Sequence, residues 1–294
     1  MRFLRCCSFC SASSEGIDPK VYFPYGLPED LVHVTPESPQ ELQDEFVEGF
    51  AASFCGTNEQ APEPALSWAY MSPGMNDVDH TKPLSKEVTE SKDFSERVVF
   101  FRYLMHLCFV HAGRHGGCFA LKESGKLVAF TITFPPNKRG IYKMGFCEMM
   151  HVVVQLGGFQ KMPKAVKKVL ITEGEPGVRM DVIDKAMGLS HKTHCPNEVP
   201  HIYIWCFGVK PGCQGNGYGR KLITYMGECA DRMKVPTYLE CNGTKNERFY
   251  GNNGYKVEER YPLVYTDKKG GEKTEHSFQP DGLPGMSACV RPSR

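Results

Sequence analysis

The stretch from Cys206 to Leu222 reads CFGVKPGCQGNGYGRKL, and the interpretation of the whole chain starts from it. An apolar strand runs into a loop with glycines at positions 215, 217 and 219, and this loop opens a helix. Glycine lets the backbone approach an anion closely, and the first N–H groups of a helix have no partner within it. Because the helix dipole also favours negative charge, the stretch predicts a site for a phosphate or pyrophosphate group.

Two common phosphate-binding motifs do not fit this loop. A P-loop needs a lysine followed by serine or threonine after its last glycine, whereas Arg220 and Lys221 precede Leu222 here. A dinucleotide fingerprint has the spacing GxGxxG after the first strand of a βαβ unit, whereas the spacing here is GxGxG, late in the chain. Since glycines are common in loops, this spacing alone would favour a structural turn without a ligand.

The residues around the loop resemble the acetyl-CoA motif of the GNAT superfamily of N-acetyltransferases. The run VKPGCQGNGYG at 209–219 is similar to the family pattern Val-x-Pro followed by Gln or Arg-x-x-Gly-x-Gly or Ala. Downstream, NERFYGNNGY at 246–255 is similar to the family element Asn-x-x-Phe-Tyr-x-x-x-Gly-Phe. The strong resemblance covers about residues 199–262, and two ordered motifs at the right separation are far more specific than one.

The resemblance implies a fold of class α/β (α+β). We expect a mixed, mostly antiparallel sheet of about seven strands, splayed between the fourth and fifth strands, with helices on both faces. A single GNAT domain is expected over residues 31–294, after a flexible N-terminal segment at 1–30. Residues from about 138 to 196 have only a partial counterpart, so we expect a divergent or inserted region there.

Apolar periodicity and turn residues predict the same order of elements from the residues themselves. Strands are predicted at 31–34, 117–121, 127–134, 201–209, 237–241, 255–264 and 286–290. Helices are predicted at 39–54, with Ser38 as cap, at 94–112, with Gly113 past its end, and at 220–233 and 246–252. Weaker helical stretches are predicted around 149–154, 163–172 and 180–187.

The resemblance also implies a set of cofactor contacts, most of them through the main chain. Pantetheine is expected in the gap beside the fourth strand, bonded to backbone groups near Phe207, Gly208 and Val209. Asn246 is expected either to orient pantetheine or to cap its helix. The pyrophosphate is expected at the amides of Gln214, Gly215, Asn216, Gly217, Tyr218, Gly219 and Arg220.

Tyr250 is the candidate general acid, because a phenol within hydrogen-bonding reach could protonate the CoA thiolate that leaves. A half-buried aromatic side chain packed under the short helix is the alternative interpretation. A general base must take a proton from the amine, and the candidates are His201, Glu198 and Glu240. Strand alternation places His201 on one face with Tyr203, Trp205 and Phe207.

Other residues carry weaker signals. Trp68 and Tyr70 are expected to help form the acceptor pocket. The group His191, His194 and Cys195 has some resemblance to a zinc site, but no second pair follows at metal spacing, so we expect a surface loop and no metal.

Composition excludes several classes of protein. Hydrophobic residues make up 41% and charged residues 23%, and the net charge of +1 gives no basic field for nucleic acid. No apolar run approaches a membrane span. The 13 cysteines show no secreted disulfide pattern, so we expect reduced thiols and a cytoplasmic protein. Two arginines and three cysteines among the first ten residues leave organelle targeting or palmitoylation open.

The sequence thus predicts an acetyl-CoA-dependent N-acetyltransferase that transfers acetyl to a primary amine by direct attack in a ternary complex. The acceptor, a small molecule or a protein amine, stays open, as does the choice between monomer and homodimer. The alternative is a CoA-binding sensor or interaction module that keeps the fold without turnover. Release of free thiol in an amine screen separates the two.

Overall fold

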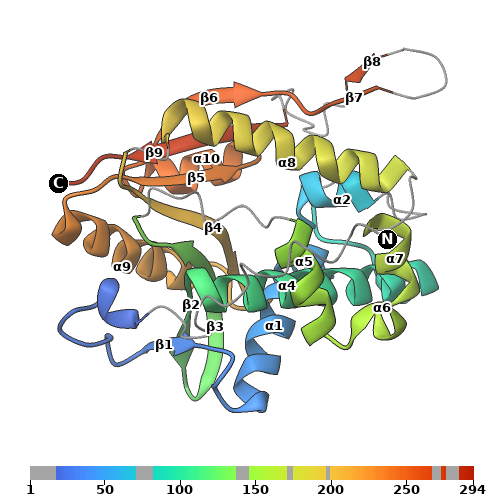
Figure 1. Ribbon diagram of the computed structural model, residues 1–294, viewed down its shortest axis with the longest axis horizontal. Helices are drawn as coiled ribbons and strands as arrows, with labels where there is room; N and C mark the ends of the chain where they lie inside the picture. Colours follow the sequence, from blue (N-terminus) through green and yellow to red (C-terminus); the bar gives the residue numbers. More distant parts are fainter. Residues whose placement is uncertain are drawn as a thin grey trace, which may run out of the picture.

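The computed structural model of the protein describes residues 18–70, 82–136, 146–170, 175–196, 199–266, 273–275 and 285–294. A seven-stranded sheet forms its centre, in the spatial order β1-β2-β3-β4-β5-β9-β6 (Figure 1). Neighbouring strands are antiparallel except for β4 and β5, which run parallel. The strands are β1 (Leu31–Val34), β2 (Gly117–Glu123), β3 (Lys126–Phe134), β4 (Ile202–Val209), β5 (Thr237–Cys241), β6 (Lys256–Tyr261) and β9 (Met286–Arg291), with β7 (Val264–Thr266) and β8 (Lys273–Glu275) in a separate pair.

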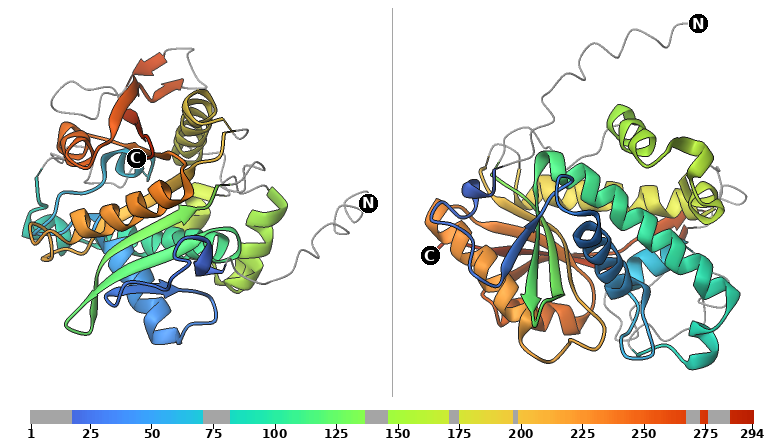
Figure 2. Two further views of the ribbon diagram at one scale, coloured as in Figure 1. Left: turned by 90° about the vertical axis from the view of Figure 1, so that its left-hand side faces the viewer. Right: turned by 90° about the horizontal axis from the view of Figure 1, so that it is seen from below.

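Helices cover both faces of this sheet, as predicted. Helices α1, α4 and α8 pack on one face, and α9 and α10 pack on the other (Figure 2). The helices are η2 (Pro19–Val21), α1 (Gln40–Cys55), α2 (Pro64–Tyr70), α3 (Lys86–Thr89), α4 (Lys92–His115), α5 (Phe146–Gln155), α6 (Gly158–Lys161), α7 (Lys164–Leu170), α8 (Glu175–His194), α9 (Tyr218–Met233) and α10 (Thr244–Gly251). The predicted mixed sheet with helices on both faces is therefore confirmed.

Aromatic side chains at helical spacing hold α1 against the sheet. Phe46 and Phe50 contact Phe130 of β3, each with ring centroids 5.7 Å apart. Between them, Gly49 has no side chain, and a Cβ there would lie 2.3 Å from Phe130 Cζ. The helix therefore lies close to β3, which places its C-terminal end beside β4.

Two helix ends differ from the predictions. Helix α4 begins after Ser91, whose hydroxyl accepts a hydrogen bond from Phe94 N at 3.1 Å, and it continues through Gly113 to His115. At the start of α1, Ser38 does not cap the helix, because its hydroxyl accepts a hydrogen bond from Thr35 N at 3.0 Å instead. Local caps outside the helix compete for the same donors and acceptors.

The flexible segment at residues 1–30 stays a prediction; residues 18–30, which the structure describes, contribute two buried side chains. Tyr22 and Phe23 are buried, and both rings contact Phe119 of β2 edge to face, with centroids 5.2 and 5.5 Å away. These two rings attach this part of the segment to β2.

The region expected as an insertion contributes helices α5 to α8 in its described residues. Helix α8 packs against α2, β6 and β9 and so covers the half of the sheet that α1 and α4 leave open. His191 and His194 lie in its last turn, so the expectation of a surface loop at these residues was wrong. His191 is buried, because α8 turns this side chain toward the sheet.

Candidate active site

The sheet opens between its two parallel strands. Only Ile202–Ile204 of β4 pair with β5, opposite Thr237–Leu239, and the two strands separate beyond that point. Against β3, Ile132 faces Cys206 while Thr133 faces Ile204, so Trp205 is an extra residue in a β-bulge. The predicted splay between the fourth and fifth strands is therefore present, and it leaves one edge of β4 unpaired with β5.

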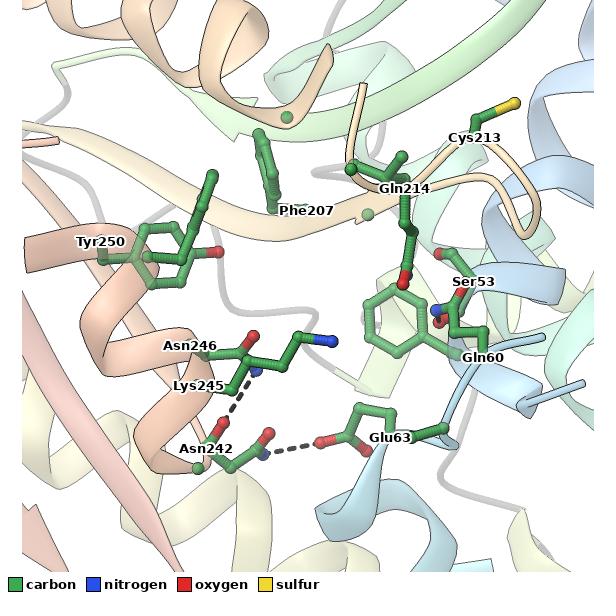
Figure 3. A pocket seen from close by; sticks show the side chains of 18 of the residues that line it. Ser53, Gln60, Glu63, Phe207, Cys213, Gln214, Asn242, Lys245, Asn246 and Tyr250 are labelled. Atoms are coloured by element: carbon green, nitrogen blue, oxygen red, sulfur yellow. Dashed lines mark hydrogen bonds between the residues drawn. The ribbon is translucent and has the colours of Figure 1, made fainter. Parts of the chain in front are cut away.

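A cavity of about 790 Å³ occupies this opening (Figure 3). Its wall combines the end of β4, the glycine loop with the start of α9, the turn into α10, and the segment before α2. The residues that line it include Ser53, Glu63, Phe207, Gly208, Val209, Gln214, Gly215, Gly217, Tyr218, Gly219, Arg220, Asn242, Asn246, Phe249 and Tyr250. The structure thus brings together most residues predicted to contact the cofactor. Asn216 lies in the same loop but does not line the cavity, and its side-chain amide donates a hydrogen bond to Cys213 O.

One end of the cavity is suited to an anion. Gly217 precedes α9 in a left-handed conformation (φ 81°) and no side chain caps the helix there. The first amides of a helix have no partner within it, so those at the start of α9 face the cavity unpaired by the helix. A Cβ on Gly215 or Gly217 would meet no atom within 4 Å, so this space is open for a ligand.

Two further glycines of the motif serve packing as well as access. A Cβ on Gly208 would lie 2.2 Å from Ser53 Oγ of α1, and one on Gly219 would lie 3.1 Å from Val209 Cγ2. Glycine at these positions lets α1 and α9 approach β4 from opposite faces. The lack of side chains also leaves the main chain of β4 accessible from the cavity.

Tyr250 lies on α10 at the inner part of the cavity (Figure 3). Its ring is 7% exposed and contacts Phe249 and Phe207 edge to face, with centroids 5.0 and 6.2 Å away. Burial raises the pKa of this phenol well above its ordinary value, so the hydroxyl keeps its proton at neutral pH. Asn246, one helical turn earlier, donates from Nδ2 to Asn242 O at 2.7 Å and so joins α10 to the end of β5.

Glu63 is a cavity residue that the sequence analysis did not identify. Its carboxylate accepts hydrogen bonds from Asn242 Nδ2 at 2.6 Å and from Ala65 N at 3.1 Å (Figure 3). Burial raises the pKa of the Glu63 carboxyl above its usual value. The only signal in the sequence is an acid directly before Pro64, a residue typical of a helix start.

His201 lies away from the cavity, at the opposite end of β4. It is 4% exposed, and its Nδ1 donates to Val199 O at 2.7 Å. Its Nε2 then accepts from Nε2 of His191, 2.6 Å away, and burial lowers its pKa. The structure therefore does not bring His201 together with Tyr250. Glu198 lies outside the described residues.

Glu240 lies on the face of β5 that packs against α8. Its Oε2 accepts a hydrogen bond from Tyr203 OH at 2.8 Å, whereas its buried Oε1 has no hydrogen-bond partner among the described residues. Burial raises the pKa of this carboxyl from 4.5 to about 8. It does not line the cavity itself, but Asn242, one residue past the end of β5, does.

The bulge and helix α2 correct two further expectations. Phe207 was expected on one face with Tyr203 and Trp205, but the extra residue at the bulge turns Phe207 to the α9 face. Trp68 and Tyr70 are each 7% exposed within α2 and belong to the core; neither lines the cavity. Residues just before them, around Glu63, line the cavity instead.

Within the parts of the chain that the structure describes, no helix combines the length and apolarity needed to cross a membrane. The same residues contain no group of three or more His, Cys, Asp or Glu side chains arranged to hold a metal ion.

Residues 180–257 match the family model described as an acetyltransferase (GNAT) domain. A search of curated proteins gave no match. The chain is similar to the solved structure of a polyamine N-acetyltransferase from Drosophila melanogaster, with TM-score 0.46 and 14% identity over 90% of this chain and 100% of that one. It is also similar to arylalkylamine N-acetyltransferase 2 from Aedes aegypti, with TM-score 0.43 and 11% identity over 90% of this chain and 100% of that one.

Proposed function

We propose that the protein transfers an acetyl group from acetyl-CoA to a primary amine by direct attack in a ternary complex, because residues 180–257 match the model of an acetyltransferase (GNAT) domain. One observation carries the proposal: a single cavity joins an anion-binding helix start to a buried, protonated phenol through the opening between β4 and β5. We further propose that residues 31–294 act as one domain, with α5 to α8 as its inserted part.

The cofactor contacts follow from the unpaired main chain around the cavity. The amides from Gln214 to Arg220 would receive the pyrophosphate, because the dipole of α9 and the side chain of Arg220 both favour negative charge there. The edge of β4 from Phe207 to Val209 is released from β5 and offers N–H and C=O groups to the pantetheine amides. Acetyl-CoA would supply the activated thioester at the inner end of the opening.

Tyr250 would act as the general acid. Its phenol stays protonated at neutral pH because burial disfavours the phenolate, so a proton is available when the carbon–sulfur bond breaks. The rings of Phe207 and Phe249 hold this side chain at the cavity wall. Donation to the sulfur makes the thiol a better leaving group than the free thiolate.

The acceptor would enter from the side of the cavity that Glu63 and Asn242 form. A carboxylate there favours a cationic amine over a neutral or anionic acceptor, since opposite charges attract strongly where water is partly excluded. Arg220 and Glu63 both line the cavity. The proposal therefore puts the pyrophosphate near Arg220 and the acceptor amine near Glu63.

The test combines binding with turnover. Calorimetric titration with acetyl-CoA should show binding, and a panel of primary amines should then release free thiol with at least one member. Binding without thiol release from any amine would favour the sensor function, and absence of binding would overturn the proposed site.

A further inference from the structure

The outer surface of helices α5, α6 and α7 combines exposed apolar side chains with lysines. Val154, near the end of α5, is 63% exposed, and Phe159 of α6 is 43% exposed. Lys161 and Lys164 follow closely in the chain and are also exposed. We call these four residues the α5–α7 patch. Figures 1 and 2 place the three helices at one side of the molecule, away from α9 and α10.

The apolar members of the patch are not part of the core. On α5, Val152 and Val153 are buried, and on α7, Val166 is buried; all three belong to the main hydrophobic cluster. The inner sides of α5 and α7 are thus already packed, and Val154 and Phe159 remain outside. A single exposed apolar side chain is ordinary, but apolar side chains set among cations indicate a surface for binding.

The charge around the patch has one sign. Positions 149–172 contain no aspartate or glutamate but four lysines, at 161, 164, 167 and 168. The chain as a whole is balanced, with 35 lysines and arginines against 34 acids, so this stretch departs from the rest. Neither Lys161 nor Lys164 forms an ion pair with any residue that the structure describes. The patch therefore presents two unpaired cations beside its apolar side chains.

A phospholipid surface matches this combination of side chains. Apolar side chains of a membrane-surface helix enter the boundary between headgroups and acyl chains, while neighbouring lysines meet anionic headgroups. A protein partner fits less well, because protein interfaces are depleted of lysine. A soluble anion would use the lysines but would leave Val154 and Phe159 in water. An anionic membrane surface is the partner that uses both kinds of side chain.

We propose that the α5–α7 patch docks the protein onto a membrane surface that contains anionic phospholipids. Phe159 and Val154 enter the boundary between headgroups and acyl chains, and Lys161 and Lys164 bind the phosphate and carboxylate groups of the lipids. This docking is separate from acetyl transfer, because none of the four residues lines the cavity between β4 and β5.

Co-sedimentation of the full chain with phospholipid vesicles tests the docking. The vesicles contain phosphatidylcholine with about 30% phosphatidylserine, and vesicles of phosphatidylcholine alone serve as the neutral comparison. The parent should bind the anionic vesicles, and raising the salt concentration from about 0.1 to about 0.5 M should weaken this binding, because salt screens the lysines. No binding, or equal binding to both kinds of vesicle, overturns the proposal.

Matched variants separate the patch from the charge of the protein as a whole. Lys161→Gln combined with Lys164→Gln should weaken vesicle binding roughly twentyfold, at about fivefold for each lysine. Lys192→Gln combined with Lys256→Gln removes the same charge from exposed positions on α8 and β6 and should bind as the parent does. All four positions are exposed, so the urea midpoints should stay near that of the parent. An equal loss of binding in the two double variants overturns the proposal.

The apolar members of the patch require a separate measurement. Phe159→Ala should weaken vesicle binding roughly tenfold, because the aromatic ring no longer leaves water on docking. Leu189→Ala, at an exposed apolar position on α8, should bind as the parent does. In Phe159→Trp, lipids brominated in their acyl chains should quench the added fluorescence. Binding by Phe159→Ala equal to that of the parent, or no quenching in Phe159→Trp, would show that the lysines only attract anions and would overturn membrane docking.

Discussion

Replacing Glu240 by glutamine changes how stability depends on pH. The amide keeps the size of the side chain and can still accept the hydrogen bond from Tyr203, but it cannot ionise. Burial raises the pKa of the Glu240 carboxyl from 4.5 to about 8 in the folded chain. Between these values the folded chain holds a proton that the unfolded chain has released.

The sign and size of the effect follow from this difference. The stabilising contribution is fully present below about pH 4.5, is lost as pH rises toward about 8, and changes little above that. At about 1.4 kcal/mol for each pKa unit, the shift from 4.5 to about 8 corresponds to at most about 5 kcal/mol of unfolding free energy. Glutamine removes this dependence, so the variant should gain stability relative to the parent as pH rises.

Urea unfolding at about pH 6 and about pH 8.5 measures this difference. Glu258→Gln is the control, because Glu258 is exposed on the edge strand β6 and its variant should keep the parent's pH dependence. If the parent and Glu240→Gln lose stability equally between the two pH values, Glu240 is not held protonated by burial, and the reasoning about this carboxyl is wrong.

Three further predictions concern the cavity. Gly217→Val should abolish acetyl-CoA binding measured by calorimetry while the fold is retained. A β-branched residue does not tolerate φ 81°, and its side chain would occupy the open space proposed for the pyrophosphate. Unchanged affinity for acetyl-CoA would contradict the assignment of this loop. Tyr250→Phe should lower kcat by roughly a hundredfold with acetyl-CoA affinity kept, and equal activity would return Tyr250 to a packing role. Gly208→Ala should lower the free energy of unfolding, measured in urea, by about 1–3 kcal/mol, because the added Cβ would lie 2.2 Å from Ser53 Oγ. Adding Ser53→Ala to this variant should recover part of the lost stability. If it does not, the clash with Ser53 is not the cause of the loss.

The parts of the fold that local sequence specifies were predictable. The hairpin of β2 and β3 was predicted from two apolar runs around Gly125, and the strand, glycine loop and helix of the cofactor site were predicted from one motif. In both cases the signal is local, because the hairpin occupies residues 117–134 and the motif residues 206–222, and turn residues mark where each element ends. The predicted splay depended on the family resemblance, because nothing in β5 alone shows where its pairing with β4 ends.

The parts that depend on long-range packing were not predictable. The bulge at Trp205 arises from the pairing of β3 with β4, and it reversed the face expected for Phe207. Glu63 reaches the cavity because it bonds Asn242, which is distant in sequence. The last turn of α8 was expected to be a loop, because its sequence is polar. In the structure its polar side chains Ser190 and His191 contact other buried polar groups, and a helix packed in this way has no apolar periodicity in its sequence.

The most direct test of acetyl transfer follows the acetyl group itself. Acetyl-CoA with an isotope label in the acetyl group is mixed with the protein and an amine that releases thiol, and mass spectrometry quantifies the labelled amide, free CoA and acetate. Transfer at this cavity predicts labelled amide and free CoA in equal amounts, with neither formed by Gly217→Val. Labelled acetate in place of the amide, or no consumption of acetyl-CoA with any amine, would contradict it.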